Sequence, residues 1–347
     1  MLDFFKTPRL YFFRLVLLVV QPFYFRRFKL CGVGVENVPA EGPYLIVANH
    51  SHLLDPFFIG AVIRKPIFQM ASNEFFRKPL VRRFMWAMGA FPRKKGFVDF
   101  KSIKYAIHLV RQGHPLGIYP EGGRNWDGET LPILHSTAKL VKLLNVPLVT
   151  VVVKGNYKAY PRWANRRRKS PITIQVAEPV TFGRDTPDEE ILQHIQRGIY
   201  NNDNYTPVPY IRGKNPAEGL TRLLWRCPAC RELESLQERG GDRLGCATCS
   251  REGAVNLDCF MRGKGSGERR AVKEYADTMF RAEEVIPFDP GDSRVPEPAY
   301  LRSRTVTLYH EPRYPRLEKV GTGRLLLTDE GLVFVPEQGG AHRNDTR

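Results

Sequence analysis

Residues 44–60 read YLIVANHSHLLDPFFIG, and this stretch decides the expected fold. The apolar run at residues 44–48 precedes a short polar loop and a second apolar run. The first run is typical of a buried strand. Asp55 followed by Pro56 predicts a helix start, because the carboxylate can accept first-turn N–H groups and proline fits the first helical position. The pattern therefore predicts a strand, a loop that carries His50, and a helix.

His50 and Asp55 have the residue types of a general base and its carboxylate partner. A carboxylate beside an imidazole fixes the tautomer and stabilises the protonated ring, which leaves the other ring nitrogen free to take a proton from a hydroxyl. A purely structural interpretation is the alternative, in which Asp55 only caps the helix and His50 ends a strand. We expect His52 to be a solvent-facing neighbour.

Two further blocks carry strand patterns. The strand expected at residues 90–93 ends in three consecutive cations, Arg93, Lys94 and Lys95. Residues 146–153 form a continuous apolar run, as expected for a strand buried on both faces.

Between them, a strand expected at residues 115–120 ends in a Pro-Glu-Gly-Gly-Arg turn. Gly122 and Gly123 allow the backbone to approach a ligand closely and expose its N–H groups. Arg124 adds a bidentate donor that suits phosphate.

These four blocks, in this order, resemble the glycerolipid acyltransferases, the family of 1-acylglycerol-3-phosphate acyltransferases. The family pattern is Asn-His-x4-Asp, a glycine-rich strand with a basic end, Phe-Pro-Glu-Gly-Thr-Arg, and Val-Pro-hydrophobic, and the match runs over residues 30–200. The resemblance implies that His50 is the general base and Asp55 its partner. It also implies substrate-binding residues in the other blocks, namely Arg93, Lys94, Lys95, Glu121, Gly122, Gly123, Arg124 and Pro147.

The activity that this resemblance implies is O-acyl transfer from acyl-CoA or acyl carrier protein to the hydroxyl of 1-acylglycerol 3-phosphate. The chain lacks a Gly-x-Ser-x-Gly motif, and no cysteine lies near these blocks, so direct attack without an acyl-enzyme is expected. Gly123 stands where the family usually has threonine or serine. After the glycine-rich turn the family tends to show Pro-Phe-Lys-x-Gly, whereas residues 132–136 read Pro-Ile-Leu-His-Ser. Because this lysine and glycine are missing, the acceptor stays open to glycerol 3-phosphate, another lysolipid or an aminolipid. A non-catalytic basic protein that binds lipid or nucleic acid is the alternative of a different class.

The charge of the chain predicts an anionic partner. Its 347 residues carry a formal net charge of +17, which fits nucleic acid, anionic lipid or a phosphorylated substrate. Residues 10–25 are largely apolar, but Arg14 interrupts them and cations flank them, so the segment is too short to span a bilayer. The segment predicts a helix in the membrane interface. The alternatives are a soluble core helix and a signal peptide, which needs a cleavage site with small residues.

Membrane lipid is therefore the preferred partner and nucleic acid is not expected. We expect a monotopic or peripheral protein at the cytoplasmic face of a membrane. A second basic cluster in residues 154–169 predicts contacts with lipid headgroups or with the phosphates of coenzyme A; a solvated loop is the alternative. Its members are Lys154, Lys158, Arg162, Arg166, Arg167, Arg168 and Lys169, with Tyr157, Tyr160 and Trp163 interleaved.

Two Cys-x-x-Cys pairs, Cys227–Cys230 and Cys246–Cys249, are separated by fifteen residues. This spacing matches a zinc ribbon, in which four thiolates hold a structural Zn²⁺. Two disulfides would need an oxidising compartment, and redox chemistry usually needs only one such pair. We expect Cys31 and Cys259 to be packing residues.

Alternating strands and helices predict an α/β fold with a largely parallel sheet flanked by helices. The expected strands are 44–48, 66–71, 90–93, 115–120 and 147–153, with another near an edge at 172–176. The expected helices are 56–63, 74–88, 99–112, 135–145 and 188–201. The expected organisation is an interfacial segment (1–30), an acyltransferase domain (31–203), a linker (204–222), a zinc ribbon (223–255) and a small β-rich region (256–347) that includes a hairpin at 324–335.

Overall fold

The computed structural model describes residues 15, 16, 18, 22, 25–94, 99–263, 269–280, 299–302, 306–313, 316–328 and 331–336. It divides into two compact units, residues 1–279 and 280–347. The interfacial helix expected at residues 10–25 lies almost entirely outside the described residues, and so does Lys95. Among the helices that the structure describes, none combines the length and apolar character needed to cross a membrane.

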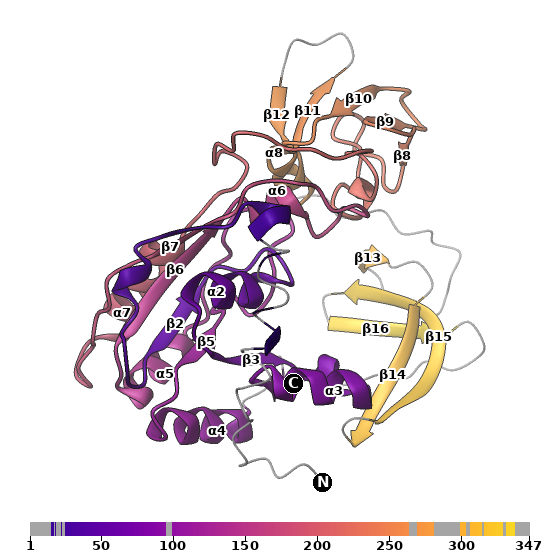
Figure 1. Ribbon diagram of the computed structural model, residues 1–347. Helices are drawn as coiled ribbons and strands as arrows, with labels where there is room; N and C mark the ends of the chain where they lie inside the picture. The colour runs from indigo at the N-terminus through magenta and orange to yellow at the C-terminus, as the bar shows by residue number, and fades with distance from the viewer. Residues whose placement is uncertain are drawn as a thin grey trace. The chain divides into compact units, whose positions relative to one another are not determined.

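The first unit is built around a seven-stranded sheet (Figure 1). Its strands, in spatial order, are β1 (Cys31–Val33), β7 (Thr173–Val176), β6 (Leu148–Lys154), β2 (Leu45–Ala48), β5 (Leu116–Ile118), β3 (Phe68–Ser72) and β4 (Ala90–Arg93). All neighbours pair in parallel except β6 and β7. The predicted strands and the largely parallel sheet are confirmed. The expected additional strand, β7, lies beside the edge strand β1, which the sequence did not predict.

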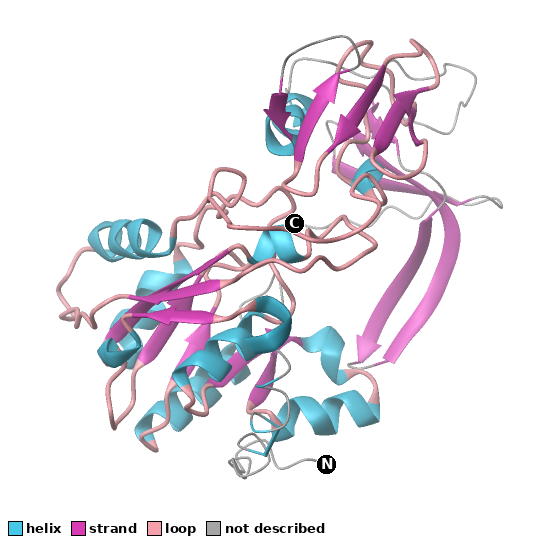
Figure 2. Ribbon diagram, turned by 45° about the horizontal axis from the view of Figure 1, so that its top comes forward, coloured by secondary structure: helices cyan, strands magenta, loops and turns pink. Residues whose placement is uncertain are grey.

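Helices cover both faces of this sheet (Figure 2). They are η1 (Val35–Asn37), α2 (Asp55–Ile63), η2 (Asn73–Phe76), α3 (Pro79–Ala87), α4 (Phe100–Arg111), α5 (Ser136–Leu144), α6 (Asn156–Ala159) and α7 (Asp188–Ile199). Alternate side chains of β2 enter different cores, because successive strand residues point to opposite faces. Ile46 packs in the core with α2, whereas Leu45 and Val47 pack in the core with α4, α5 and α7.

The single helix expected at residues 74–88 is two elements, η2 and α3. Pro79 lacks an N–H donor, so it cannot continue a helix from the preceding turn, but it suits the start of a new one. The prediction of helical structure was right, and the prediction of one continuous helix was wrong.

A second sheet completes the first unit. It is antiparallel, with the order β12 (Arg269–Ala271), β11 (Phe260–Gly263), β10 (Glu252–Val255), β9 (Arg243–Cys246) and β8 (Leu236–Glu238). Helices η3 (Leu220–Arg222), α8 (Val272–Asp277) and η4 (Thr278–Phe280) flank it in the chain. The sheet continues past residue 255, where we expected the ribbon to end. Ala217 and Leu220, from the expected linker, are buried in the core of this region.

The second unit contains a four-stranded antiparallel sheet. Its strands are β13 (Ala299–Arg302), β14 (Val306–Arg313), β15 (Arg316–Thr328) and β16 (Gly331–Pro336). Strands β15 and β16 pair with Thr328 opposite Gly331, which confirms the hairpin predicted at residues 324–335.

Candidate active site

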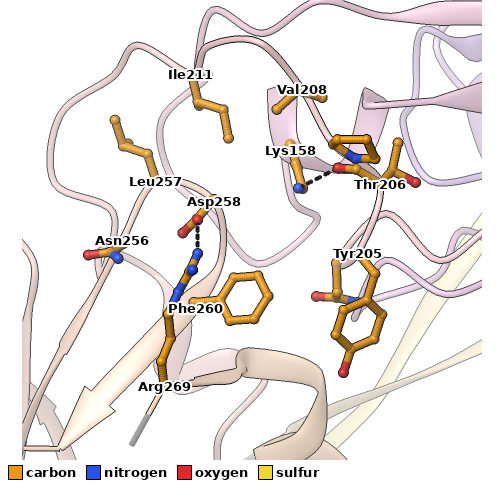
Figure 3. A pocket seen from close by; sticks show the side chains of 12 residues that line it. Lys158, Tyr205, Thr206, Val208, Ile211, Asn256, Leu257, Asp258, Phe260 and Arg269 are labelled. Atoms are coloured by element: carbon orange, nitrogen blue, oxygen red, sulfur yellow. Dashed lines mark hydrogen bonds and ion pairs between the residues drawn. The ribbon is translucent and has the colours of Figure 1, made fainter. Parts of the chain in front are cut away.

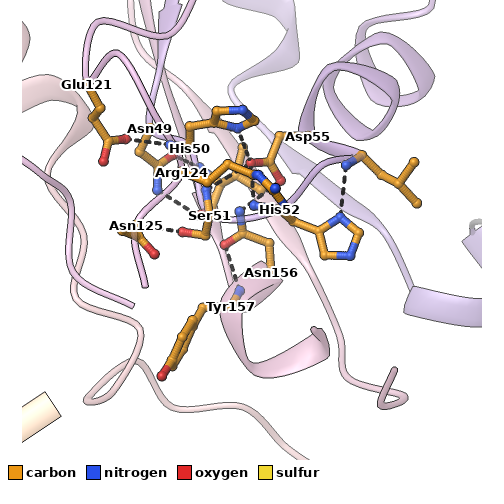
Figure 4. A network of polar contacts seen from close by, with 12 residues as sticks. Asn49, His50, Ser51, His52, Asp55, Glu121, Arg124, Asn125, Asn156 and Tyr157 are labelled. Carbon is orange, nitrogen blue, oxygen red and sulfur yellow. Dashed lines mark hydrogen bonds and ion pairs between the residues drawn. The ribbon is translucent and has the colours of Figure 1, made fainter. Parts of the chain in front are cut away.

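His50 and Asp55 meet in the loop between β2 and α2 (Figure 4). The distance between His50 Nδ1 and Asp55 Oδ2 is 2.9 Å, the Asp55 side chain is fully buried, and the His50 side chain is 18% exposed. An ionised carboxylate only accepts hydrogen bonds, so Nδ1 carries the proton and Nε2 is the basic nitrogen. No hydrogen bond from the described residues occupies Nε2. The predicted contact between imidazole and acid is confirmed.

Asp55 does not cap its helix. Helix α2 begins at Asp55 itself, and no side chain caps it. Instead, Asp55 Oδ2 also accepts hydrogen bonds from the backbone N–H groups of Ser51 at 3.0 Å and His52 at 2.9 Å. Because both donors precede the helix, they hold the carboxylate facing the loop that carries His50.

The other oxygen of Asp55 is held by a residue that the sequence analysis missed. Asn156, fully buried at the start of α6, donates from Nδ2 to Asp55 Oδ1 at 2.9 Å. Strand β6 runs parallel to β2, so the segments after the two strands meet at the carboxyl edge of the sheet. That adjacency was the available signal, but the sequence analysis treated the segment after β6 only as a basic cluster.

Asp203 holds the backbone on both sides of Asn156. Its buried carboxylate accepts from the N–H groups of Gly155 at 2.8 Å and Tyr157 at 3.0 Å, on either side of Asn156. Burial raises the pKa of Asp203, and these donors oppose the rise. Asn49 adds a second link between the strands, since its side chain accepts from the N–H of Val153 at 2.7 Å and donates to the Val153 carbonyl at 3.0 Å.

Glu121 holds the backbone of the active-site loop. Its Oε1 accepts from the N–H of His50 at 2.5 Å, and its Oε2 accepts from the N–H of Leu131 at 2.7 Å. Burial raises the pKa of this carboxyl to about 8, and the two N–H donors partly offset that rise. Both oxygens are thus engaged within the protein. This corrects the substrate-binding role expected for Glu121, which we now interpret as a positioning residue.

The glycine-rich turn lies against the same loop. The N–H of Asn125 donates to the carbonyl of His50 at 3.0 Å, and its Nδ2 donates to Ser51 Oγ at 2.9 Å. Gly122 has a φ of 70°, and an added Cβ would approach Leu134 to 3.1 Å. An added Cβ on Gly123 would meet nothing within 4 Å. The turn therefore leaves open space next to Arg124.

Arg124 is the cation of this turn. It is half-buried, and no carboxylate among the described residues forms an ion pair with its guanidinium. Arg124 lies near the loop that carries His50 (Figure 4), and its positive charge helps to lower the pKa of His52. A partly desolvated arginine without an acidic partner suits an anionic group on a ligand.

His52 is buried and neutral, so the expectation of a solvent-facing side chain was wrong. It is 1% exposed, and its Nδ1 accepts the N–H of Leu54 at 2.9 Å. Burial lowers the pKa of His52 to about 4, and Arg124 and Arg167 act in the same direction. The neighbouring His50 ring stacks on Tyr119, and the two ring centroids are 4.2 Å apart.

The remaining predicted site residues lie at both edges of the sheet. Arg93 ends β4 and pairs with Ser72 of β3, so it lies at the carboxyl edge, as His50 does. The backbone N–H of Lys94 donates to Asp99 Oδ2 at 2.9 Å. Pro147 precedes β6, and its carbonyl accepts the N–H of Leu45 at the opposite, amino edge. The substrate-binding role expected for Pro147 was therefore wrong.

Comparison with known proteins bears on this site. Residues 29–154, which contain His50, Asp55, Glu121 and Arg124, match the family model described as Acyltransferase. This stretch is an acyltransferase domain. The matched stretch begins just before β1 and ends with β6, so β7 and α7, which belong to the same sheet and core, lie beyond it.

Relatives share this domain at low identity. The chain is 29% identical over 121 residues to a 1-acyl-sn-glycerol-3-phosphate acyltransferase of Bacillus subtilis, covering 35% of this chain and 60% of that protein. It is 27% identical over 179 residues to the human 1-acyl-sn-glycerol-3-phosphate acyltransferase alpha, covering 51% and 62%. The chain therefore spans about three fifths of each of these two relatives. The crystal structure of the 1-acyl-sn-glycerophosphate acyltransferase PlsC from Thermotoga maritima is similar, with 23% identity, a TM-score of 0.45 and coverage of 53% of this chain and 77% of that one.

Part of the basic cluster after β6 is structural. Arg168 is buried, and its guanidinium donates to the carbonyls of Leu257 and Pro216 and to Cys259 Sγ. Trp163 and Tyr157 are fully buried. These side chains join the acyltransferase domain to the second sheet, so the expected contact with headgroups or coenzyme A was wrong for them. Arg167 and Lys169 are exposed.

A cleft of about 560 Å³ lies where the loop at residues 204–211 meets the second sheet (Figure 3). Lys158 is buried there, and its Nζ donates to the Thr206 carbonyl at 2.7 Å. Arg269 pairs with Asp258. The charges of this cleft are satisfied within the protein, and we assign no substrate to it.

The four predicted zinc ligands come together. The sulfur atoms of Cys227, Cys230, Cys246 and Cys249 all lie within 4.8 Å of one another. Cys227 and Cys249 are 3.9 Å apart, and Cys230 and Cys246 are 3.6 Å apart. A tetrahedral zinc with bonds of about 2.3 Å places its sulfur ligands about 3.8 Å apart, so the donor set fits this ion.

Proposed function

We propose that this chain is a phospholipid-synthesising O-acyltransferase whose acceptor is 1-acylglycerol 3-phosphate. The observation that carries the proposal is the 2.9 Å contact between His50 Nδ1 and the buried Asp55 carboxylate, with Arg124 on the adjoining turn. The match of residues 29–154 to the Acyltransferase model supports the reaction class.

In the proposed reaction, His50 Nε2 takes the proton of the acceptor hydroxyl as its oxygen attacks the thioester carbonyl carbon. A new C–O bond forms, the C–S bond breaks, and the departing thiolate takes the proton back from the imidazolium. Asp55 stabilises the imidazolium between these steps and holds the ring in place. General-base catalysis of this kind is worth about 100- to 10,000-fold in rate.

Arg124 and the open side of the Gly122–Gly123 turn form the proposed site for the acceptor phosphate. The guanidinium offers two parallel N–H donors, which match two phosphate oxygens. Arg93, at the same edge of the sheet, supplies a further cation. The acyl donor is acyl-CoA or acyl carrier protein. Other acceptors that carry a phosphate, such as glycerol 3-phosphate, fit the same cation.

We also propose that the four-cysteine cluster holds a structural Zn²⁺. The ion would join the segment at residues 227–230 to the segment at residues 246–249, which begins at the end of β9. The buried Cys227 and Cys246 favour a structural site over an exposed redox pair.

We further propose that the protein acts at the cytoplasmic face of a membrane as a peripheral or monotopic protein. The formal net charge of +17 and the lipid nature of the proposed acceptor support this location.

The test is acyl transfer by the purified full chain, with labelled acyl-CoA and a panel of acceptors. The His50→Ala substitution should lower the rate of acyl transfer to 1-acylglycerol 3-phosphate by about 100-fold or more. The matched control is His135→Ala, because His135 is an exposed histidine just before α5. An H50A protein with the wild-type rate would rule out the mechanism, and a clear preference for another acceptor would replace the substrate.

A further inference from the structure

Helix α3 carries three apolar side chains that are exposed to solvent. Leu80 is 81% exposed, Phe84 is 42% exposed and Val81 is 37% exposed. Leu80 and Phe84 are four residues apart and therefore lie side by side on one face of the helix. No residue of α3 is buried. A helix on a globular domain normally turns its apolar side to the core, so the exposed apolar side chains of α3 are unusual.

The opposite side of the same helix attaches it to the domain. Trp86 lies about 200° around the helix from Phe84. Its ring contacts Phe76 at a centroid distance of 6.2 Å and Tyr105 of α4 at 5.8 Å. The outward position of Leu80 and Phe84 therefore follows from the packing of Trp86.

Cations predominate in the sequence around α3, with Glu74 directly before the basic segment. Residues 75–94 contain six cations and no acidic residue: Arg77, Lys78, Arg82, Arg83, Arg93 and Lys94. Lys78 and Arg83 are exposed. An exposed apolar patch marks an interaction site, and a basic rim selects a negatively charged partner.

We propose that α3 docks the protein on an anionic lipid bilayer. Leu80, Phe84 and Val81 would enter the boundary between headgroups and acyl chains, and Lys78 and Arg83 would contact anionic headgroups. A helix of nine residues is about 14 Å long, so it lies in the interface and does not cross the membrane.

The position of α3 in the fold favours lipid over an acidic protein. Helix α3 begins seven residues after the end of β3, whose carboxyl end lies at the same edge of the sheet as His50. Docking through its first turn brings that edge towards the membrane. This step rests on the proposed function, because a lysophospholipid acceptor resides in the bilayer.

The test compares binding of the full chain to vesicles of phosphatidylcholine with and without phosphatidylglycerol. The double variant Leu80→Gln/Phe84→Gln should bind at least about 10-fold more weakly to the anionic vesicles, because it removes apolar surface without changing charge. The control is Leu143→Gln, since Leu143 is 55% exposed near the end of α5, at the amino edge of the sheet. It should bind as wild type does.

A second variant tests the charged rim. Lys78→Gln/Arg83→Gln should bind anionic vesicles about 30-fold more weakly, from about tenfold per 1.4 kcal/mol and about 1 kcal/mol per cation. Binding of this variant to pure phosphatidylcholine should not change. Thermal unfolding of both double variants should match wild type, since neither changes a buried residue.

Two activity measurements separate this inference from the proposed function. With acceptor in detergent micelles, the Leu80→Gln/Phe84→Gln protein should keep the wild-type rate, whereas with acceptor in vesicles its rate should fall with binding. Wild-type vesicle binding by this variant would overturn the docking surface and leave the proposed reaction intact. Absence of acyl transfer by the wild-type protein in micelles would overturn the reaction, while vesicle binding would still decide the surface.

Discussion

Removal of the Asn156 side chain should weaken catalysis without weakening substrate binding. Asn156 Nδ2 is 2.9 Å from Asp55 Oδ1, and both side chains are fully buried. In the Asn156→Ala protein, that carboxylate oxygen loses this donor in a site from which water is excluded. Leaving a buried acceptor without a partner costs about 1–3 kcal/mol, and more for a charged group.

The same loss should appear in the rate, because Asp55 must stabilise the imidazolium of His50 as it forms. At about 1.4 kcal/mol for each factor of ten, the expected fall in kcat is about 5- to 150-fold. The KM for the acceptor should change little, since the Asn156 side chain is enclosed and contacts no substrate. The unfolding free energy should fall by about 1–3 kcal/mol.

The assay is steady-state acyl transfer in detergent micelles, with urea unfolding of the same preparations. Asn165→Ala is the matched control, because Asn165 is exposed and its Nδ2 contacts Glu218 at 3.3 Å on the surface. A destabilised Asn156→Ala protein with a kcat within twofold of wild type would refute the reasoning. It would mean that the N–H groups of Ser51 and His52 hold Asp55 without help.

Three further changes have defined outcomes. Burial lowers the pKa of His52 from its ordinary value of 6.5 to about 4, so the unfolded chain binds the proton more tightly than the folded chain does. The unfolding free energy should therefore fall by up to about 3 kcal/mol as the pH drops from 6.5 to 4. Urea unfolding at both pH values should show that the His52→Asn protein loses much of this dependence. The Nζ of Lys273, in α8, is 2.8 Å from Glu129 Oε2 and 3.5 Å from Asp127 Oδ2, and both acids lie in the loop that follows Asn125. The Lys273→Met substitution should therefore speed amide hydrogen exchange at residues 125–130. Unchanged exchange would show that α8 does not hold this loop. Metal analysis should find about one zinc per chain, and a chelator should lower the unfolding temperature of wild type but not of a protein with serine at the four ribbon cysteines.

The strands and helices of the acyltransferase domain were predictable because their signals are local. An apolar run marks each buried strand, and the Asp55-Pro56 pair marks the start of α2. The four blocks around His50, the glycine-rich turn and the cysteine pairs were visible for the same reason. Pro79 likewise broke the expected helix at residues 74–88 by a local rule, which the sequence analysis did not apply.

The contacts that complete the site are not local. Glu121 reaches the N–H of His50 across 71 positions, and Asn156 reaches Asp55 across 101. Strand order and register create these contacts, and neither leaves a periodic trace in the sequence. Pro147 is a further example. The motif predicted it at the site, but the direction of β6 puts it at the opposite edge of the sheet.

The sequence by itself determined most strands and helices of the main sheet, the pairing of His50 with Asp55, and the strongly basic character of the chain. Only the tertiary structure decided that Glu121 and Asn156 position the His50–Asp55 pair, that Arg168 is an internal link, and that α3 turns Leu80 and Phe84 outwards. The reason is physical: side-chain type and spacing determine local conformation, whereas burial and partners depend on which distant segments pack together.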